Sequence, residues 1–267
     1  MEPLPLALAD GMTIARRNII RIRRVPEIAM AAVVQPVFMI VMFGYVFGGS
    51  IQLASGNYRE FMVGGIFALV LTFGAVFTGA GLAEDMTNGV MDRFRTLPMA
   101  RSAVVLGRAV SDVVLNSLSL VVMGVVGYAV GWRIRGGLID AATAVVLLLA
   151  FAFALSWVMA FVGLSVRSVE VVNNAAMTVI FPVTFIANTI VPAENLPAVL
   201  QTIAEWNPVS SVTQATRELF GNIPAGTPEP AAWSLQHPVI YTLGWIALII
   251  AVFAPLSVRK YNQAATR

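Results

Sequence analysis

The sequence predicts an all-α membrane protein with six transmembrane helices and both termini in the cytoplasm. Three observations lead to this fold class. Of the 267 residues, 58% are apolar and only 12% are charged, which is about half the charge of an average soluble domain. The apolar residues gather in runs of about 20, the length that crosses a bilayer as a helix. The Arg and Lys residues fall between these runs with a strong asymmetry, which sets the orientation.

Six apolar runs are long enough to cross a bilayer as helices. Each run is longer than a transmembrane strand, and none alternates with a period of two residues, so the pattern argues against a transmembrane β-barrel. The third run is the least apolar, because its first turns carry Ser111, Asp112 and Asn116. The predicted spans cover residues 28–47, 61–82, 103–130, 141–166, 171–191 and 239–258.

The basic residues indicate the orientation, since Arg and Lys concentrate in cytoplasmic loops. We therefore expect one multi-pass domain over residues 1–267 in the cytoplasmic membrane, with the first span acting as an uncleaved anchor. The opposite orientation would invert the bias. With the N-terminus inside, 13 of 17 basic residues are cytoplasmic (Arg16, Arg17, Arg21, Arg23, Arg24, Arg93, Arg95, Arg101, Arg108, Arg167, Arg259, Lys260 and Arg267) and four are outside (Arg59, Arg133, Arg135 and Arg217).

The composition excludes several kinds of site. The chain has no cysteine and one histidine, which excludes disulfides, a cysteine nucleophile, Cys-ligated zinc and any multi-histidine metal centre. Lys260 is the only lysine, so the chain has no G-x-x-x-x-G-K-[ST] phosphate-binding loop. We therefore expect a chain that is not an enzyme and that binds no metal or cofactor of its own.

Residues 10–25 predict an amphipathic helix at the inner membrane surface. Met12, Ala15, Ile19 and Ile22 fall on one helical face. Basic side chains on the other faces can meet anionic lipid headgroups. This helix either anchors the N-terminus or transmits force to a cytoplasmic partner. The basic residues assigned to it are Arg16, Arg17, Arg21 and Arg24.

The inner loop, residues 84–101, predicts a short helix with one apolar face. Val90, Met91, Phe94 and Leu97 share that face, and Pro98 ends the helix because proline pushes the preceding residue out of the α region. The apolar face of a cytoplasmic helix must be shielded from water. The helix either folds back on the membrane surface or docks into a groove on a soluble subunit.

Two segments of the chain resemble a known family. The inner loop reads E-x4-G-x2-DRFRTLP-x2-R, which resembles the inner-loop motif of ABC-2 type exporter permeases and is especially similar to the daunorubicin/doxorubicin-resistance branch. The outer segment, 192–236, contains L-P-x-x-L-x-x-I-A-x-x-N-P, similar to the outer segment of the same family. The residues that carry the resemblance are Glu84, Gly89, Asp92, Arg93, Phe94, Arg95, Leu97, Pro98 and Arg101 in the loop, and Leu196, Pro197, Trp206, Asn207 and Pro208 outside.

The resemblance implies one half of the membrane part of an ATP-driven exporter. Two copies, or two related permeases, would pair around a path that works by alternating access. The inner loop would be the coupling helix in a cleft of a cytoplasmic ABC ATPase, present in two copies that bind ATP and Mg. The N-terminal helix would lie beside the coupling helix as an interface helix. The outer segment would form re-entrant helices that cap the exit.

Polar and aromatic residues inside the spans are candidates for lining the path, because polar groups in a bilayer are costly and often functional. The alternative is ordinary interhelical packing. Asp112 lies one turn after Arg108, so we expect an i,i+4 ion pair rather than a proton relay. The candidate path residues are Thr72, Phe73, Phe77, Phe181, Thr184, Phe185 and Asn188.

Four functions compete. The sequence favours export of a hydrophobic drug, lipid or natural product. Export of a surface polysaccharide or teichoic-acid-like polymer is the second reading, but it would favour a dense Trp/Tyr stripe, which is absent. An intramembrane serine protease needs G-x-S-G, whereas Ser165 is followed by Val166, and His237 lies at a span edge. A secondary transporter would need ionisable groups at the bilayer midplane, and none is evident in the predicted spans.

Overall fold

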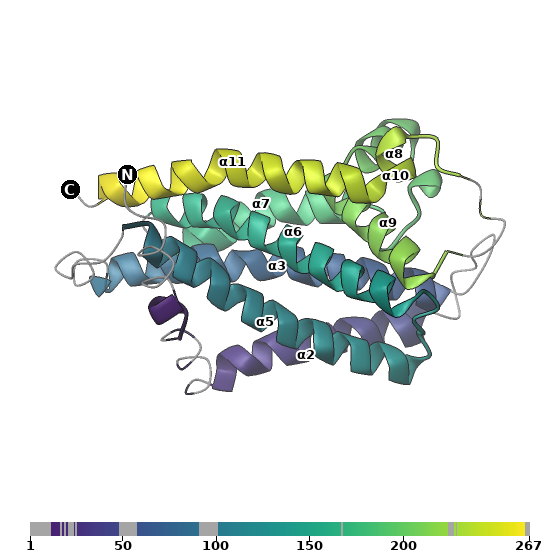
Figure 1. Ribbon diagram of the computed structural model, residues 1–267, viewed down its shortest axis with the longest axis horizontal. Helices are drawn as coiled ribbons and strands as arrows, with labels where there is room; N and C mark the ends of the chain where they lie inside the picture. The colour runs from purple at the N-terminus through teal and green to yellow at the C-terminus, as the bar shows by residue number, and fades with distance from the viewer. Residues whose placement is uncertain are drawn as a thin grey trace.

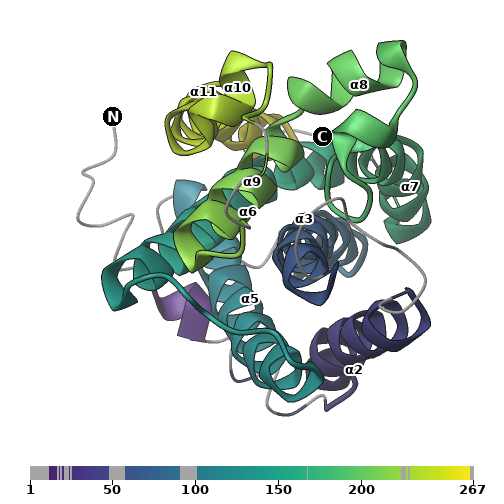
Figure 2. The same ribbon diagram turned by 90° about the vertical axis from the view of Figure 1, so that its right-hand side faces the viewer.

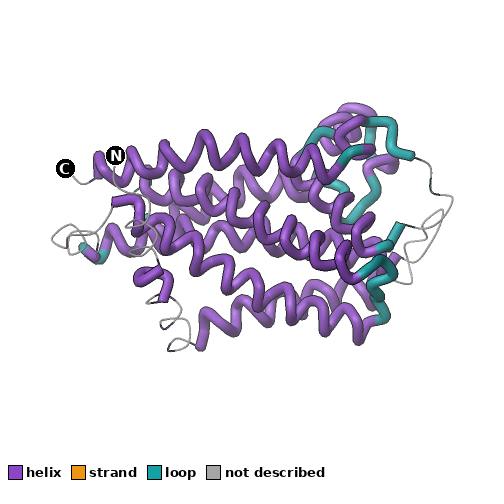
Figure 3. The backbone as a smooth tube through the Cα atoms, in the orientation of Figure 1, coloured by secondary structure: helices purple, strands orange, loops and turns teal. Residues whose placement is uncertain are grey.

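The computed structural model describes residues 12–16, 18, 20, 24, 26–47, 58–90, 101–166, 168–223, 227 and 229–264. All regular secondary structure in these residues is helical (Figure 1, Figure 3), which confirms the predicted all-α class. The long helices run along one axis, and the short ones gather at one end of the bundle. The elements are α2 (Pro26–Met42), the π-helix η1 (Phe43–Phe47), α3 (Tyr58–Thr87), α5 (Arg101–Val130), α6 (Leu138–Ser165), α7 (Val169–Ile186), the 3-10 helix η2 (Ala193–Asn195), α8 (Ala198–Glu205), α9 (Pro208–Phe220), α10 (Trp233–Gln236) and α11 (Pro238–Ala264).

Five of the described helices are long and apolar enough to cross a membrane: α3, α5, α6, α7 and α11. The first predicted span, 28–47, is divided between α2 and the π-helical turn η1. Pro36 lies inside α2, where it lacks the N–H that would bond to the carbonyl four residues earlier. In η1, Gly44 packs against α5 so closely that a Cβ there would lie 2.8 Å from Val130 Cγ1.

The helix α3 is the centre of the bundle (Figure 2). It packs against α5, α6, α7 and α9, and 72% of its most apolar stretch is buried, against 17% for α7 and for α11. Small residues allow the close crossing of α3 and α6. A Cβ on Gly79 would lie 2.6 Å from the Met159 carbonyl oxygen, and a Cβ on Gly163 would overlap the Gly79 backbone.

The six long helices divide by proline content. Pro36, Pro182 and Pro255 lie inside α2, α7 and α11. The helices α3, α5 and α6 contain no proline. Sharp helix bends arise mainly at proline or π-helical turns, so α3, α5 and α6 lack the commonest cause of a kink.

The helices of the outer segment follow from local capping signals. Asn207 caps α9 because its Oδ1 accepts a hydrogen bond from the Val209 amide at 2.8 Å. Pro208 occupies the first turn, where its missing N–H costs nothing. Gly221 ends α9 with a φ of 70°, a left-handed conformation that glycine adopts without strain.

Candidate translocation groove and the two ends of the bundle

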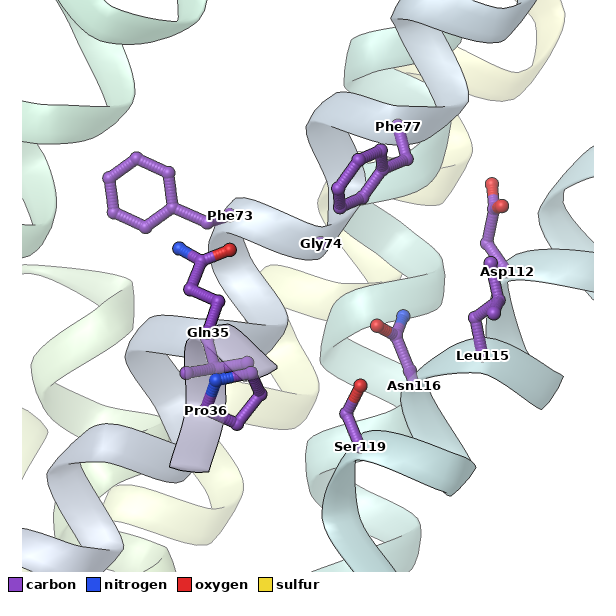
Figure 4. A pocket seen from close by; sticks show the side chains of 10 residues that line it. Gln35, Pro36, Phe73, Gly74, Phe77, Asp112, Leu115, Asn116 and Ser119 are labelled. Carbon is purple, nitrogen blue, oxygen red and sulfur yellow. The ribbon is translucent and has the colours of Figure 1, made fainter. Parts of the chain in front are cut away.

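A groove opens between the middle parts of α2, α3 and α5 (Figure 4). The groove is open rather than enclosed, and the space between its walls, counted out into the open mouth, is about 510 Å³. The lining is mostly apolar and carries a few polar side chains, which is the usual make-up of a small-molecule site. The lining residues are Gln35, Pro36, Val70, Phe73, Gly74, Phe77, Asp112, Leu115, Asn116 and Ser119.

Two of the predicted path residues line this groove, both from α3. Phe73 and Phe77 come from successive turns of α3 and both line the groove, with Phe77 on the side nearer Asp112 (Figure 4), and Phe77 is 45% exposed. Thr72 does not line it: its side chain is buried and donates to the Ala68 carbonyl at 2.7 Å. The groove therefore presents two aromatic surfaces from α3. The Thr72 hydroxyl instead makes its hydrogen bond within α3.

The ion pair predicted from the Arg108–Asp112 spacing is present. Arg108 Nε lies 3.9 Å from Asp112 Oδ1, and Asp112 also accepts a hydrogen bond from the Thr78 hydroxyl. The guanidinium donates from Nη2 to the Phe77 carbonyl at 3.1 Å. Gly81 of α3 leaves room for the Arg108 guanidinium, because a Cβ at position 81 would overlap it. The buried Asp112 carboxylate thus has a cation and a hydroxyl as partners.

Asn116 is a groove residue that the sequence did not single out as one. Its side chain is buried, and its Oδ1 lies over Gly74, where a Cβ would be 2.6 Å away. Its Nδ2 has no hydrogen-bond partner among the described residues. The signal was available in the sequence: Asp112, Asn116 and Ser119 are spaced i, i+4 and i+7, so they share one face of a helix.

The candidate path residues of α7 lie outside the groove. Phe181 and Phe185 stack on each other with ring centroids 4.2 Å apart, and both are largely exposed. Thr184 is buried and donates to the Ile180 and Phe181 carbonyls. Asn188 is buried where the outer segment begins, and its amide donates to Ser210 Oγ at 3.1 Å. The structure therefore separates the seven candidates into an α3 group and an α7 group.

The end of the bundle that carries the short helices is held by a buried arginine on α9. Arg217 is 2% exposed. It donates from Nε to the Phe61 carbonyl at 2.8 Å, and from Nη2 to the Asn188 and Thr189 carbonyls at 2.8 Å and 3.1 Å. The sequence placed Arg217 only among the outer basic residues. Its position three residues before the buried Phe220, on one helical face, was the signal for burial.

The outer-segment residues that carry the family resemblance serve the caps and surface of the short helices. Pro197 precedes α8 and is exposed, Leu196 is half-buried, and Trp206 is 49% exposed at the end of α8. Asn207 donates from Nδ2 to the Val183 carbonyl of α7 at 2.7 Å. Asn207 therefore ties α9 to α7 as well as capping its own helix, with Pro208 next to it.

A second outer arginine joins the loop after α5 to α3. Arg135 donates to Glu60 from Nε and Nη2, at 2.8–3.1 Å. Because the Glu60 carboxylate binds the charged form, these hydrogen bonds and its negative charge raise the pKa of Arg135. The pair fixes this loop beside the start of α3.

At the end of the bundle opposite the short helices, the structure describes only the borders of the predicted coupling helix. Glu84 lies in the last turns of α3, and Gly89 has a φ of 66° in the turn that follows. Arg101 is the first residue of α5. The other residues of this prediction, Asp92, Arg93, Phe94, Arg95, Leu97 and Pro98, lie outside the described part of the chain.

The described N-terminal residues contact the bundle near the end of α3 and the start of α5. Ile14 packs in a buried cluster with Leu82 and Val104, and the neighbouring Ala15 is buried as well. Met12 is 65% exposed in the protein, which leaves it free for the membrane contact predicted for this face. Arg16 and Arg24 are exposed, as expected, whereas Arg17 and Arg21 lie outside the described residues.

Comparisons with known proteins agree with this architecture. Residues 11–220 match the family described as ABC-2 type transporter. The chain is 31% identical to the daunorubicin resistance ABC transporter permease protein of Streptomyces coeruleorubidus, over 96% of this chain and 87% of that protein. It is 23% identical to the probable doxorubicin resistance ABC transporter permease protein of Mycobacterium tuberculosis, over 89% and 82%. It is also 23% identical to a putative transport permease of Porphyra purpurea, over 78% and 73%.

The family match covers well over half of the chain, and the Streptomyces relative is aligned along nearly all of it. The apolar helices and these relatives together identify a multi-pass protein of the cell membrane. The chain belongs to the ABC-2 type transporter family.

Proposed function

We propose that this chain is the transmembrane permease subunit of an ATP-driven exporter that moves a hydrophobic drug, lipid or natural product out across the cytoplasmic membrane by alternating access. The observation that carries the proposal is the 31% identity to a daunorubicin resistance permease over 96% of the chain. The aromatic and mostly apolar lining of the α2–α3–α5 groove supports a hydrophobic cargo.

The proposed topology has six spans with both termini in the cytoplasm. In it, α2 and η1 act together as the first span, because the 22 residues 26–47 would reach about 33 Å as a helix. Charge supports the orientation. The described basic residues near the inner ends are Arg16, Arg24, Arg101, Arg108, Arg259 and Lys260, and those of the outer end are Arg59, Arg133, Arg135 and Arg217.

Energy would come from a partner, since this chain has no phosphate-binding loop. Two copies of a cytoplasmic ABC ATPase would bind ATP and Mg, and the loop 84–101 of each permease would dock into one of them as a coupling helix. The permease would act as a homodimer or with a related permease. Closure of the ATPases would favour the outward-open state through the difference in binding energy between the two states.

The short helices α8, α9 and α10 would form a re-entrant cap over the exit. Apolar side chains there support this placement: Val199, Ile203 and Trp206 are exposed on or beside α8, and backbone at membrane depth must be sheltered by protein or a cavity. The cap would be fastened to the spans through Arg217 and Asn207.

The test is ATP-dependent uptake of daunorubicin into inside-out vesicles that contain this chain and a co-expressed partner ABC ATPase. We expect uptake that needs both subunits and disappears when the Walker A lysine of the ATPase is replaced. Uptake that is equally fast without this chain would refute the proposal. Uptake of a polysaccharide precursor, but not of daunorubicin, would assign a different cargo.

A further inference from the structure

Asn116 presents a hydrogen-bond donor that nothing in the described chain uses. The residue is 6% exposed, it lines the α2–α3–α5 groove, and its Nδ2 lacks a partner among the described residues. A buried donor without a partner is costly, and most such groups in folded proteins have one. The groove beside it is the space from which a partner can come (Figure 4).

The depth of Asn116 limits what this partner can be. It lies near the middle of α5 (Arg101–Val130), and its neighbour Gly74 lies near the middle of α3 (Tyr58–Thr87). Gln35 is near the middle of the stretch formed by α2 and η1. The hydrocarbon core is about 30 Å thick, so lipid ester oxygens are about 15 Å from its midplane. A lipid tail at this depth has no acceptor to offer.

The charges around the groove favour an uncharged acceptor. Asp112, the one acidic lining residue, already has Thr78 and Arg108 as partners. A carboxylate at this position disfavours an anionic ligand, and a cation would have to compete with the Arg108 guanidinium. The neutral amide of Asn116 matches a carbonyl, ether or hydroxyl oxygen.

Two aromatic rings complete the site. Phe73 and Phe77 stand one turn apart on α3 and border the same groove as Asn116. Aromatic side chains bind flat apolar ring systems by stacking or edge contacts. A molecule with a flat ring system and a ring carbonyl can therefore contact Phe73 or Phe77 with its face while its oxygen reaches Asn116.

We propose that the α2–α3–α5 groove is a binding subsite for the exported molecule, in which Asn116 Nδ2 donates to a neutral carbonyl or hydroxyl oxygen and Phe73 and Phe77 hold a flat apolar ring system. The inference rests on the proposed export function, and it assigns the cargo a chemical class: planar, mainly apolar molecules with an oxygen acceptor. It also makes Asn116 a specificity-determining residue.

The experiment uses two probes that share one ring system, anthraquinone with its carbonyls and anthracene without them. The full chain in lipid nanodiscs is loaded with daunorubicin, whose fluorescence reports binding, and each probe is tested as a competitor. In the wild-type protein we expect anthraquinone to compete about 10-fold better than anthracene, the value of one hydrogen bond. Asn116→Leu should remove this preference, because it should weaken the binding of anthraquinone and leave the binding of anthracene unchanged.

Two further variants separate the subsite from a general loss of fold. Phe77→Ala should weaken the binding of both probes by the same factor, because the exposed side chain contributes ring contact rather than hydrogen bonding. Ser117→Ala is the matched control, since its hydroxyl donates to the Val113 carbonyl of its own helix and does not line the groove. Ser117→Ala should leave both affinities unchanged.

The failures of the two proposals are distinguishable. If Asn116→Leu keeps the full preference for anthraquinone, or if the wild type shows none, the subsite is refuted. If ATP-dependent uptake of daunorubicin continues in Asn116→Leu with an unchanged KM, the subsite is again refuted while the export function stands. Loss of uptake in the wild-type vesicles refutes the drug-export function itself.

Discussion

The guanidinium of Arg217 lies over the ring of Phe61, with its central carbon 3.5 Å from the ring centroid. The same side chain donates from Nε to the Phe61 carbonyl. One residue of α3 therefore contacts the α9 cation with both its ring and its backbone. The contact joins the outer segment to the most buried helix of the bundle.

Arg217→Leu should destabilise the protein strongly. The change leaves the carbonyls of Phe61, Asn188 and Thr189 without their donor, at a cost of about 3 kcal/mol. We expect thermal unfolding in detergent to shift down by roughly 10 °C. Arg133→Leu is the control, because Arg133 is exposed and stacks on Tyr128 at the surface. Equal shifts for the two variants would show that burial of Arg217 contributes nothing.

Gly65→Ala should destabilise the protein, and Gly124→Ala should not. A Cβ on Gly65 would overlap the carbonyl group of Thr189, a backbone group that cannot rotate away, whereas a Cβ on Gly124 meets nothing within 4 Å. We expect a loss of about 2–3 kcal/mol at Gly65 from overpacking, and no loss at Gly124, since alanine favours helix more than glycine. Unfolding midpoints of the two variants, purified in parallel, decide the point.

Phe94→Asp and Leu97→Asp should each abolish co-purification with the ABC ATPase. Both residues belong to the apolar face predicted for residues 90–97, and a carboxylate there would be desolvated without a partner in any docked complex. Membrane insertion should not change, because neither residue lies in a predicted span. Thr96→Asp, off the apolar face of that helix, is the matched control. ATPase association that survives both changes would refute the coupling role.

The absence of cysteine makes the topology directly testable, because any introduced thiol is the only one in the chain. Ala225→Cys should react with a membrane-impermeant maleimide on intact cells, since residue 225 belongs to the outer segment. Thr266→Cys should react only after the membrane is permeabilised. Labelling of Thr266→Cys from outside, or of Ala225→Cys only from inside, would contradict the proposed orientation.

The features predictable from the sequence are those set by local spacing. The third span, predicted over 103–130, differs from α5 by two residues at its start, because an apolar run of this length must be helical in a bilayer. The Arg108–Asp112 pair followed from its i,i+4 spacing alone. The division of the first span at Phe43 did not follow, because the close approach of Gly44 to Val130 involves a second helix.

The functional contacts that were missed are those made between helices distant in sequence. Arg217 lies more than 150 residues from Phe61, and no local pattern says which carbonyls a buried guanidinium will reach. Asn116 shares a face with Asp112 and Ser119, which the sequence shows, but its position against Gly74 depends on how α5 crosses α3. Helix packing, rather than helix formation, decides which polar residues meet the groove.

The uninterrupted course of α3 has a mechanical consequence. Its 30 residues form a rod about 45 Å long, whose last turns lead into the inner loop and whose first turns receive Arg217. No proline lies between Thr87 and Phe61 in α3, whereas α2, α7 and α11 each have a proline at which they can bend. We therefore expect bending to concentrate in the proline-bearing helices around α3 rather than in α3 itself.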